Sequence, residues 1–150
     1  MVWWMCIVRC NEHRDRRGTE AQRKEMQDNE LSGAVIGAAI EVHKALGLGL
    51  LESAYQECLL RELQLQEIPC ESEVPIYVEY KGRVVGDAYR ADLLISGKLI
   101  VELKTVERVN SLHKAQLLTY LRLMDKPLGL LINFNTDVLK NGICRVVNNK

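Results

Sequence analysis

The sequence carries no net charge, because 20 Lys and Arg residues balance 20 Asp and Glu residues among its 150 positions. This excludes a domain-wide positive field of the kind that attracts nucleic acid, so any such binding must rely on a local patch. Between Lys98 and Lys126, six basic residues stand against three acidic ones. This local excess is compatible with a binding patch, although a solvated face is its commoner explanation.

The sequence also lacks a CxxC pair and a long apolar run. Its five cysteines are odd in number, which indicates neither a disulfide framework nor a zinc site and favours reduced thiols in a cytoplasmic protein. The apolar residues 2–8 are too few to span a bilayer. They lack the basic leader and the small-residue cleavage site of a signal peptide, so we expect no membrane association.

The composition is that of a globular protein, since hydrophobic residues make up 47% and charged residues 27% of the chain. Residues 11–28 are mostly charged and polar and have weak helical periodicity. We therefore expect a disordered or loosely attached N-terminal extension over residues 1–28, followed by a single domain over residues 29–150. Met26 directly precedes the patterned region, and one hypothesis places the natural start there. An N-terminus at Met1, found by mass spectrometry of the native protein, would contradict that hypothesis.

The apolar pattern predicts the element order ααβββαββ, which is an α/β domain with a mixed sheet flanked by helices. Asn29 is a suitable N-cap for the first helix. The segment LGLLIN over 128–133 is apolar almost throughout, which is typical of a strand that is buried on both faces and paired in parallel. A final strand is expected at an edge of the sheet. The expected elements are helices over 29–46 and 50–66, strands over 73–80, 83–94 and 98–106, a helix over 112–124, and strands over 128–133 and 142–147.

Three charged residues interrupt two consecutive apolar strands. Asp92 lies on the strand over 83–94, and Glu102 and Lys104 lie on the strand over 98–106. An ion that is buried without compensation costs several kcal/mol. A divalent metal together with a phosphodiester substrate is a leading candidate for that compensation.

The length of the loop between these strands decides whether the charged groups share a face. Glu102 and Lys104 do so in any case, because side chains alternate along a strand. A three-residue loop over 95–97, with Gly97 at the position that favours positive φ, places Asp92 on the face of Glu102. A two-residue loop would place it on the opposite face. We predict the odd-length loop or an equivalent bulge.

The same register leaves a structural alternative open. It places Arg90 opposite Glu102, so that Arg90 with Glu102, and Lys104 with Asp92, could be cross-strand ion pairs on a solvated sheet face. An acid two residues before a lysine is common by chance. The three charged residues alone favour this alternative, and it is the rest of the chain that favours a functional site.

Four motifs of the chain resemble those of known families. The segment Gly49-Leu-Leu-Glu52-Ser-Ala-Tyr55 resembles the signature of the GxxExxY protein family. Asp92, the triplet Glu102-Leu-Lys104 and the pair Gln116-x-x-x-Tyr120 resemble the core of the PD-(D/E)XK nuclease superfamily, to which that family is assigned. The resemblance covers about residues 29–147. It implies a restriction-endonuclease-like core: a mixed sheet flanked by helices.

The resemblance also implies roles for individual residues. Mg²⁺ takes oxygen ligands, and the implied ligands are the carboxylates of Asp92 and Glu102 and the carbonyl of Leu103, with Mn²⁺ as a substitute. Glu52 would add a carboxylate through water or at a second ion. Lys104 would orient the attacking water or stabilise charge on the scissile phosphate. The remaining implied residues are Gln116, which would position water or Lys104, and the substrate-binding Tyr120 and Tyr55.

The implied function is metal-dependent hydrolysis of phosphodiester bonds in nucleic acid, with DNA as the expected substrate and Mg²⁺ as the expected ion. A catalytically silent nuclease-fold module for binding or assembly is the alternative. The neutral net charge and the lack of a DNA-reading motif favour that alternative. Ala91 precedes Asp92 where the superfamily pattern has proline, which is a tolerated departure. Whether the chain forms a homodimer stays open.

Overall fold

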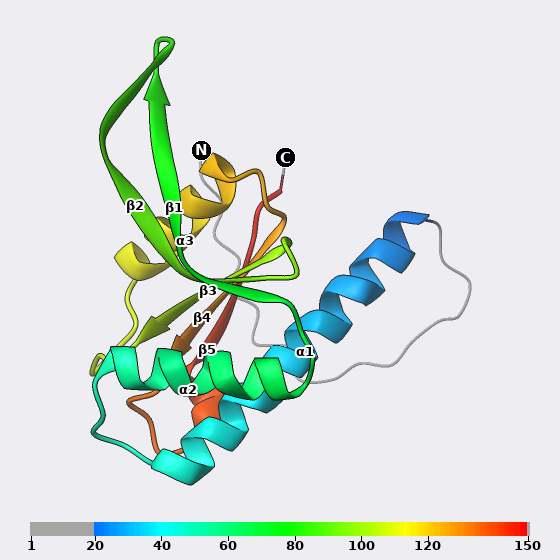
Figure 1. Cartoon of the computed structure of the whole chain (residues 1–150), viewed down its shortest axis with the longest axis vertical. Coiled ribbons are helices and arrows are strands. Elements are labelled where there is room, and N and C mark those ends of the chain that lie inside the picture. Colours follow the sequence, from blue (N-terminus) through cyan, green and yellow to red (C-terminus); the bar gives the residue numbers. More distant parts are fainter. Residues whose placement is uncertain (1–19, 150) are drawn as a thin grey trace.

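The computed structural model of the chain describes residues 20–149, with the side chains of 27–86 and 89–149 (Figure 1). The expected extension over residues 1–28 thus lies largely outside the described residues. Apart from a short 3₁₀ helix, η1, the elements follow the expected order ααβββαββ, and the α/β class is confirmed. They are α1 (Glu20–Leu46), α2 (Glu52–Leu65), β1 (Cys70–Tyr80), β2 (Arg83–Ile95), β3 (Leu99–Lys104), α3 (Ser111–Leu123), β4 (Leu128–Asn133), η1 (Leu139–Gly142) and β5 (Ile143–Val147).

The strands form one mixed five-stranded sheet in the order β1-β2-β3-β4-β5. Strands β3 and β4 are parallel, and all other neighbours are antiparallel. Helix α3 supplies the crossover that a parallel pair requires. Every residue of β4 is buried, as expected from its apolar sequence. Strand β5 lies at one edge of the sheet, also as expected, and β1 lies at the other.

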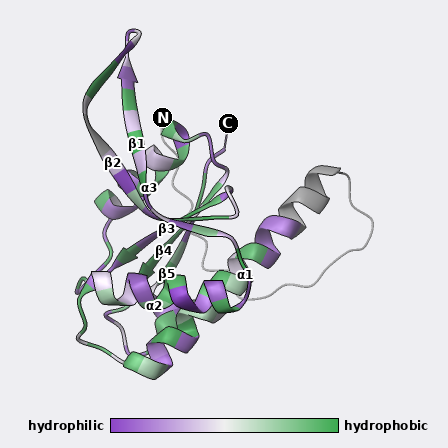
Figure 2. Cartoon of the chain, viewed as in Figure 1, coloured by the Kyte–Doolittle hydropathy of each residue, from purple (hydrophilic) through white to green (hydrophobic). Residues whose placement is uncertain are grey.

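Helices cover both faces of the sheet (Figure 1). Helices α1 and α2 pack on one face, around a cluster that includes Leu59 and Phe134. Helix α3 packs on the other face, over Ile100 and Leu131. Figure 2 shows β3 and β4, between these layers, mostly in the colour of hydrophobic residues. Glu102 is therefore an exception, a buried acid in the middle of the sheet.

Helix α1 starts earlier than the sequence indicates. It begins at Glu20, so Asn29 lies inside the helix and is not its N-cap. The side chain of Asn29 instead accepts a hydrogen bond from Arg145 of β5. The expected boundary between residues 28 and 29 falls within one helix, because the preference of Asn29 for a cap is local and the helix continues through it. Neither α1 nor any other described helix is long and apolar enough to cross a membrane.

The cysteine expectation holds only in part. Cys58 and Cys70 are free thiols. Burial raises the pKa of the Cys70 thiol to about 11, so it stays protonated and unreactive at neutral pH. Cys144 in β5, by contrast, is disulfide-bonded, so the reduced state expected for it is wrong.

Strands β1 and β2 are longer than the other three, with 11 and 13 residues. Their ladder continues to the pair Tyr80–Arg83 and contains a register shift after Ile76. Figure 1 shows the far end of this hairpin projecting from the body of the molecule as a two-stranded ribbon. Residues 76–89, which form that end, are called the distal ribbon below.

Candidate active site

The loop between β2 and β3 sets the register of the charged residues. Ile95 pairs with Leu99, so the loop consists of Ser96, Gly97 and Lys98. It has the predicted odd length but begins one residue later than predicted. Gly97 has a positive φ of 66° as expected, and Ser96 also has one, of 51°. The reason for the shift is burial, because Ile95 is fully buried and stays in the ladder whereas Lys98 is exposed.

This register brings Asp92 opposite Glu102. The two residues occupy the first position beyond the last ladder pair of β2 and β3, Leu93 with Val101, and a hydrogen bond joins their side chains. The two carboxyl groups that the sequence predicts to meet therefore lie next to each other. Arg90, expected opposite Glu102, instead pairs with Pro75 of β1. The register thus does not support the cross-strand pair of Arg90 with Glu102.

Asp92 and Glu102 each accept a hydrogen bond from the opposite strand. The backbone N–H of Asp92 donates to Oε1 of Glu102 at 3.0 Å. The backbone N–H of Leu103 donates to Oδ2 of Asp92 at 2.8 Å. Side chains thus replace main-chain ladder bonds at the point where β2 leaves β3 for the distal ribbon. Both carboxyl groups are anchored to the sheet itself.

Burial and mutual repulsion make this pair of acids costly to ionise. Glu102 is 4% exposed. Burial, followed by the charge of Asp92, raises the pKa of Glu102 to about 8, although the N–H of Asp92 and the charge of Lys104 lower it. Burial also raises the pKa of Asp92, against the lowering effects of the Leu103 N–H and Lys104. At neutral pH the pair therefore holds a proton, which an added positive charge would displace.

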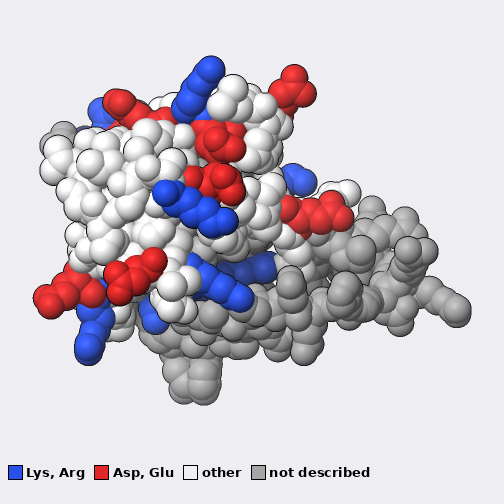
Figure 3. All heavy atoms as spheres, turned by 90° about the horizontal axis from the view of Figure 1, so that it is seen from below, with Lys and Arg blue, Asp and Glu red and all other residues white. Residues whose placement is uncertain are grey.

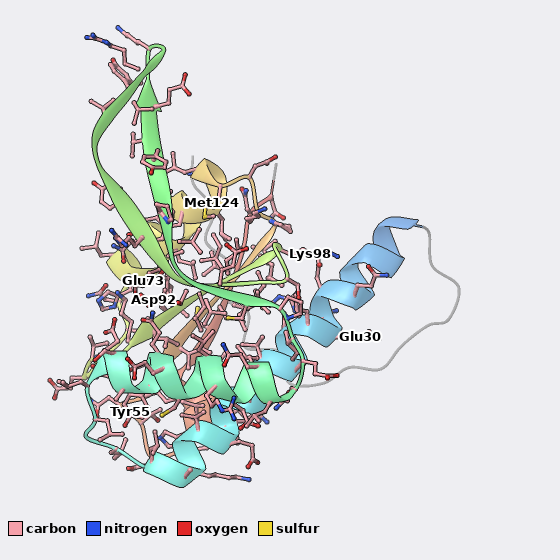
Figure 4. The ribbon with its side chains drawn as sticks, viewed as in Figure 1. Glu30, Tyr55, Glu73, Asp92, Lys98 and Met124 are labelled. Carbon is pink, nitrogen blue, oxygen red and sulfur yellow. The ribbon has the colours of Figure 1, made fainter. Side chains whose placement is uncertain are left out.

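Helix α2 brings a third carboxyl group to this pair. Glu52 is the first residue of α2. Its pKa is raised by burial and then by the charge of Asp92, and lowered by Lys104. One turn later, Nε2 of Gln56 donates to the Asp92 carbonyl at 3.3 Å and to Oε1 of Glu73 at 2.7 Å. Figure 4 shows Glu73 and Asp92 beside each other next to α2.

Helix α3 supplies two further side chains, Gln116 and Tyr120. The pKa of the Tyr120 phenol is raised by burial and then by the charge of Glu102, and a hydrogen bond with the side chain of Gln116 lowers it. The ring of Tyr120 also lies 6.0 Å, centroid to centroid, from the ring of Tyr89 on β2. Gln116 and Tyr120 are therefore a connected pair that borders the carboxyl groups.

Tyr55, expected to contact the substrate, lies in the core instead. Its side chain is 1% exposed and its ring stacks on Phe134, with 4.4 Å between centroids. Its hydroxyl donates to the carbonyl of Gly47 and accepts from the N–H of Leu50. These contacts fix the loop that leads into Glu52, so the geometry favours a structural role for Tyr55 over a substrate contact. The other predicted site residues gather at one place: Glu52, Asp92, Glu102, Leu103, Lys104, Gln116 and Tyr120.

Comparison with protein families gives a match that covers most of the chain. The model of a family described as the PD-(D/E)XK nuclease superfamily matches residues 29–146. The chain belongs to this superfamily. No curated protein and no solved structure matches the chain significantly.

Members of the PD-(D/E)XK nuclease superfamily generally use divalent metals, and the residues present here fit such an ion. Among the side chains of 27–86 and 89–149, no three His, Cys, Asp or Glu residues converge as they stand into a ready-made metal cluster. Mg²⁺, however, keeps several waters and needs only one or two protein carboxylates. Asp92 and Glu102 offer these, with Glu52 nearby, and Lys104 alone does not balance three carboxylates.

Three residues around this PD-(D/E)XK site escape prediction from the sequence: Gln56, Glu73 and Tyr89. Gln56 follows Glu52 by four residues on one helix, and this spacing is a signal that could have placed it near the site. Glu73 and Tyr89 are placed by the long-range register of β1 against β2, in which Ser72 pairs with Leu93 and Ile76 with Tyr89. No local pattern in the sequence indicates that register.

The described part of the chain also contains a cavity of about 600 Å³. It lies beyond the C-terminal ends of β3 and β4, and Arg108, Lys114 and Asn133 are among its lining residues. None of the predicted site residues lines it. The carboxyl groups thus lie at the junction of β2 and β3, outside this cavity.

Proposed function

We propose that this domain hydrolyses phosphodiester bonds in nucleic acid, with DNA as the substrate and Mg²⁺ as the ion. The observation that carries the proposal is the placement of Asp92 opposite Glu102, each bonded to the other's strand, with Lys104 on the same strand as Glu102. Membership of the PD-(D/E)XK nuclease superfamily supports it.

The carboxyl groups account for metal binding in this proposal. Asp92 and Glu102 hold the ion, the Leu103 carbonyl is a third ligand, and Glu52 binds through water or at a second ion. When bound, such an ion polarises the phosphate and lowers the pKa of water. The raised pKa values of the three acids support this assignment, because they show that buried negative charge here lacks a sufficient counter-charge.

Lys104 supplies the fixed positive charge of the proposed site. Its charge acts on Glu52, Asp92 and Glu102 alike. A protonated lysine is no metal ligand, so Lys104 instead orients the attacking water or stabilises the charge that develops on the phosphate. Gln116 is exposed and its side chain is hydrogen-bonded to Tyr120. In this proposal, Gln116 positions water or Lys104, and the Tyr120 hydroxyl donates to a phosphate oxygen.

The GxxExxY branch of the superfamily is part of the same proposal. Gly49 has a φ of 96°, a conformation that favours glycine. Glu52 begins α2 beside the acidic pair, and the Tyr55 hydroxyl bonds the loop that precedes it. Each residue of the motif thus helps to present the Glu52 carboxyl, which supports assignment to that branch.

A second candidate function is binding or assembly without catalysis. Hydrogen bonds to backbone N–H groups already engage both Asp92 and Glu102, and an ion has to share their oxygens with those bonds. The surface charge also supports this candidate. Figure 3 shows basic and acidic side chains interspersed on one face of the molecule, in place of a single basic patch.

Cleavage assays separate the two candidates. Purified protein is incubated with Mg²⁺ or Mn²⁺ and with single-stranded, duplex or branched DNA, or with RNA. Glu102→Gln and Lys104→Ala should each slow cleavage by about 100-fold or more, whereas the exposed-residue controls Glu57→Gln and Lys98→Ala should leave the rate unchanged. Full cleavage by the Glu102→Gln protein would assign the activity to a contaminant. Absence of cleavage by the wild-type protein on every substrate would contradict the catalytic function and favour the candidate that only binds or assembles.

A further inference from the structure

We propose that the distal ribbon (residues 76–89) is a binding arm for unpaired nucleotides of single-stranded nucleic acid. This inference deepens the proposed function and rests on it, because it names the form of nucleic acid that reaches the site. It is carried by three observations on the ribbon: exposed aromatic side chains, cationic side chains at the tip, and contact with the candidate active site.

The ribbon exposes large apolar side chains to an unusual degree. Tyr77, Tyr80 and Tyr89 are 58%, 64% and 53% exposed, and Val84 and Val85 are also exposed. Burial of these rings within the fold is prevented by the geometry of a two-stranded ribbon, which projects from the body with no third strand beside it (Figure 1). An exposed apolar patch of this kind marks a binding surface more often than a solvated one.

Positive charge accompanies these rings at the tip. Arg83 is the cross-strand partner of Tyr80, and Nζ of Lys81 lies 5.3 Å from the centroid of the Tyr80 ring. The ribbon carries two acids, Glu79 and Asp87, of which only Glu79 lies in the stretch from Ile76 to Arg83 that contains the tip. Aromatic rings interleaved with lysine and arginine are what a strand of stacked bases and phosphates requires. Charge complementarity thus favours nucleic acid as the occupant.

The ribbon is continuous with the candidate active site. Tyr89 pairs with Ile76 at the base of the ribbon, and its ring lies 6.0 Å from that of Tyr120. Tyr120 in turn lies close enough to Glu102 for the charge of that carboxyl group to contribute, after burial, to the raised pKa of the phenol. From this base to the Tyr80–Arg83 pair the ribbon is about 13 Å long at the usual rise per residue. A strand bound along it therefore leads directly to the carboxyl groups.

Two arguments select unpaired nucleotides over other occupants. Only unpaired bases expose the faces that tyrosine rings can stack on, since the bases of a duplex cover each other. Edge-to-edge pairing with a second copy is disfavoured, because Pro75 and the register shift after Ile76 interrupt the regular edge that such pairing uses.

Binding assays on the full chain test the inference. Fluorescence anisotropy measures the affinity of the Glu102→Gln protein, in EDTA, for a labelled single-stranded oligonucleotide and for the matched blunt duplex. Tyr77→Ala or Tyr80→Ala should weaken single-strand binding by about 5- to 100-fold and duplex binding much less. Tyr80→Trp, which keeps an aromatic ring at this position, should retain the wild-type affinity for the single strand. Leu65→Ala, at an exposed apolar site on α2, should leave the affinity for both oligonucleotides unchanged.

The cationic residues have a separate readout. Replacement of Lys81 and Arg83 by Ala should lower the slope of log affinity against log salt by about 1.4 for single strands, that is, about 0.7 for each lost phosphate contact. Because all these side chains are exposed, the variants keep the fold, which the melting temperature of each variant verifies.

The outcomes also separate this inference from the proposed function. If the protein cleaves DNA and the tyrosine variants bind single strands as tightly as before, the inference fails and the function stands. If nothing is cleaved but binding depends on the tyrosines, the function fails and the inference stands. Equal losses for single strands and duplex would overturn the preference for unpaired nucleotides. A change in oligomeric state alone, measured by light scattering, would show instead that the ribbon is an interface between two copies.

Discussion

The carboxyl groups of Asp92 and Glu102 each accept a hydrogen bond from a backbone N–H of the opposite strand. The N–H of Asp92 donates to the Glu102 carboxyl at 3.0 Å, and the N–H of Leu103, the residue after Glu102, donates to the Asp92 carboxyl at 2.8 Å. Neither side chain can turn away without releasing a backbone N–H, and a buried donor without a partner costs about 1–3 kcal/mol. The sheet therefore fixes the position of both acids whether or not a cation is bound.

This relationship predicts an unusual dependence of stability on pH. The pKa of Glu102 is raised to about 8 in the folded protein from an ordinary value of 4.5. The folded state thus binds more protons than the unfolded state between these values, so the stabilisation is fully present below about pH 4.5 and is lost as the pH rises through 8. Urea denaturation in EDTA from pH 5 to 8.5 should show the free energy of unfolding falling, by the order of a few kcal/mol.

The Glu102→Gln variant identifies the group responsible. It keeps the size and the acceptor oxygen of the side chain but cannot ionise, so the decline between pH 5 and 8.5 should largely disappear. Glu57→Gln, at an exposed position on α2, should leave the decline unchanged. A decline of the same size in the Glu102→Gln protein would assign it to other groups.

Metal binding should release protons. The carboxyl pair holds a proton near neutral pH because burial raises the pKa of both members, and a divalent ion has to displace it. Titration calorimetry with Mn²⁺ at pH 7, in buffers with different ionisation enthalpies, should therefore give enthalpies that depend on the buffer. Affinity should rise with pH up to about 8, where Glu102 ionises unaided. Asp92→Asn should weaken binding and reduce the release, whereas buffer-independent enthalpies would contradict a metal site at this pair.

Lys104 should influence both protonation and catalysis. Its charge lowers the pKa of Glu52, Asp92 and Glu102. Lys104→Met should therefore extend the decline of stability to higher pH and reduce the cleavage rate by about 100- to 1,000-fold, the usual cost of losing one electrostatic stabiliser. Lys98→Met, in the exposed loop between β2 and β3, should change neither the pH dependence of stability nor the cleavage rate. A slow variant with an unshifted stability profile would place Lys104 farther from the acids than the structure does.

Much of this architecture follows from the sequence, because burial leaves a strong pattern. The run LGLLIN predicts a doubly buried, parallel strand, and β4 is one. Where two local signals compete, the sequence is less informative. Asn29 has the chemistry of a cap, yet α1 runs through it from Glu20. The loop after β2 has the predicted odd length, but the burial of Ile95, which depends on the whole core, sets its start.

The candidate site likewise has some features that the sequence predicts and others that depend on tertiary packing. Alternation along β3, together with an odd-length loop, is enough to predict that Asp92 and Glu102 share a face. The contacts of Gln56 with Glu73 and with the Asp92 carbonyl depend instead on how α2 docks on β1 and β2. The role of Tyr55 depends on the path of the loop that its hydroxyl reaches. Neither of these is encoded in a local pattern of residues.

Substitution of Tyr55 distinguishes a structural role of the Gly49–Tyr55 motif from a contact with the substrate. Its buried hydroxyl bonds Gly47 and Leu50, so Tyr55→Phe should lower the free energy of unfolding by about 1–3 kcal/mol in urea denaturation. Tyr77→Phe, at an exposed site, should stay within about 0.5 kcal/mol of the wild type. If the loop acts by presenting Glu52, Tyr55→Phe and Glu52→Gln should each slow cleavage, and the double variant should be little slower than Glu52→Gln alone. A stable Tyr55→Phe protein with weakened nucleic-acid binding would instead restore the substrate contact that the motif suggests.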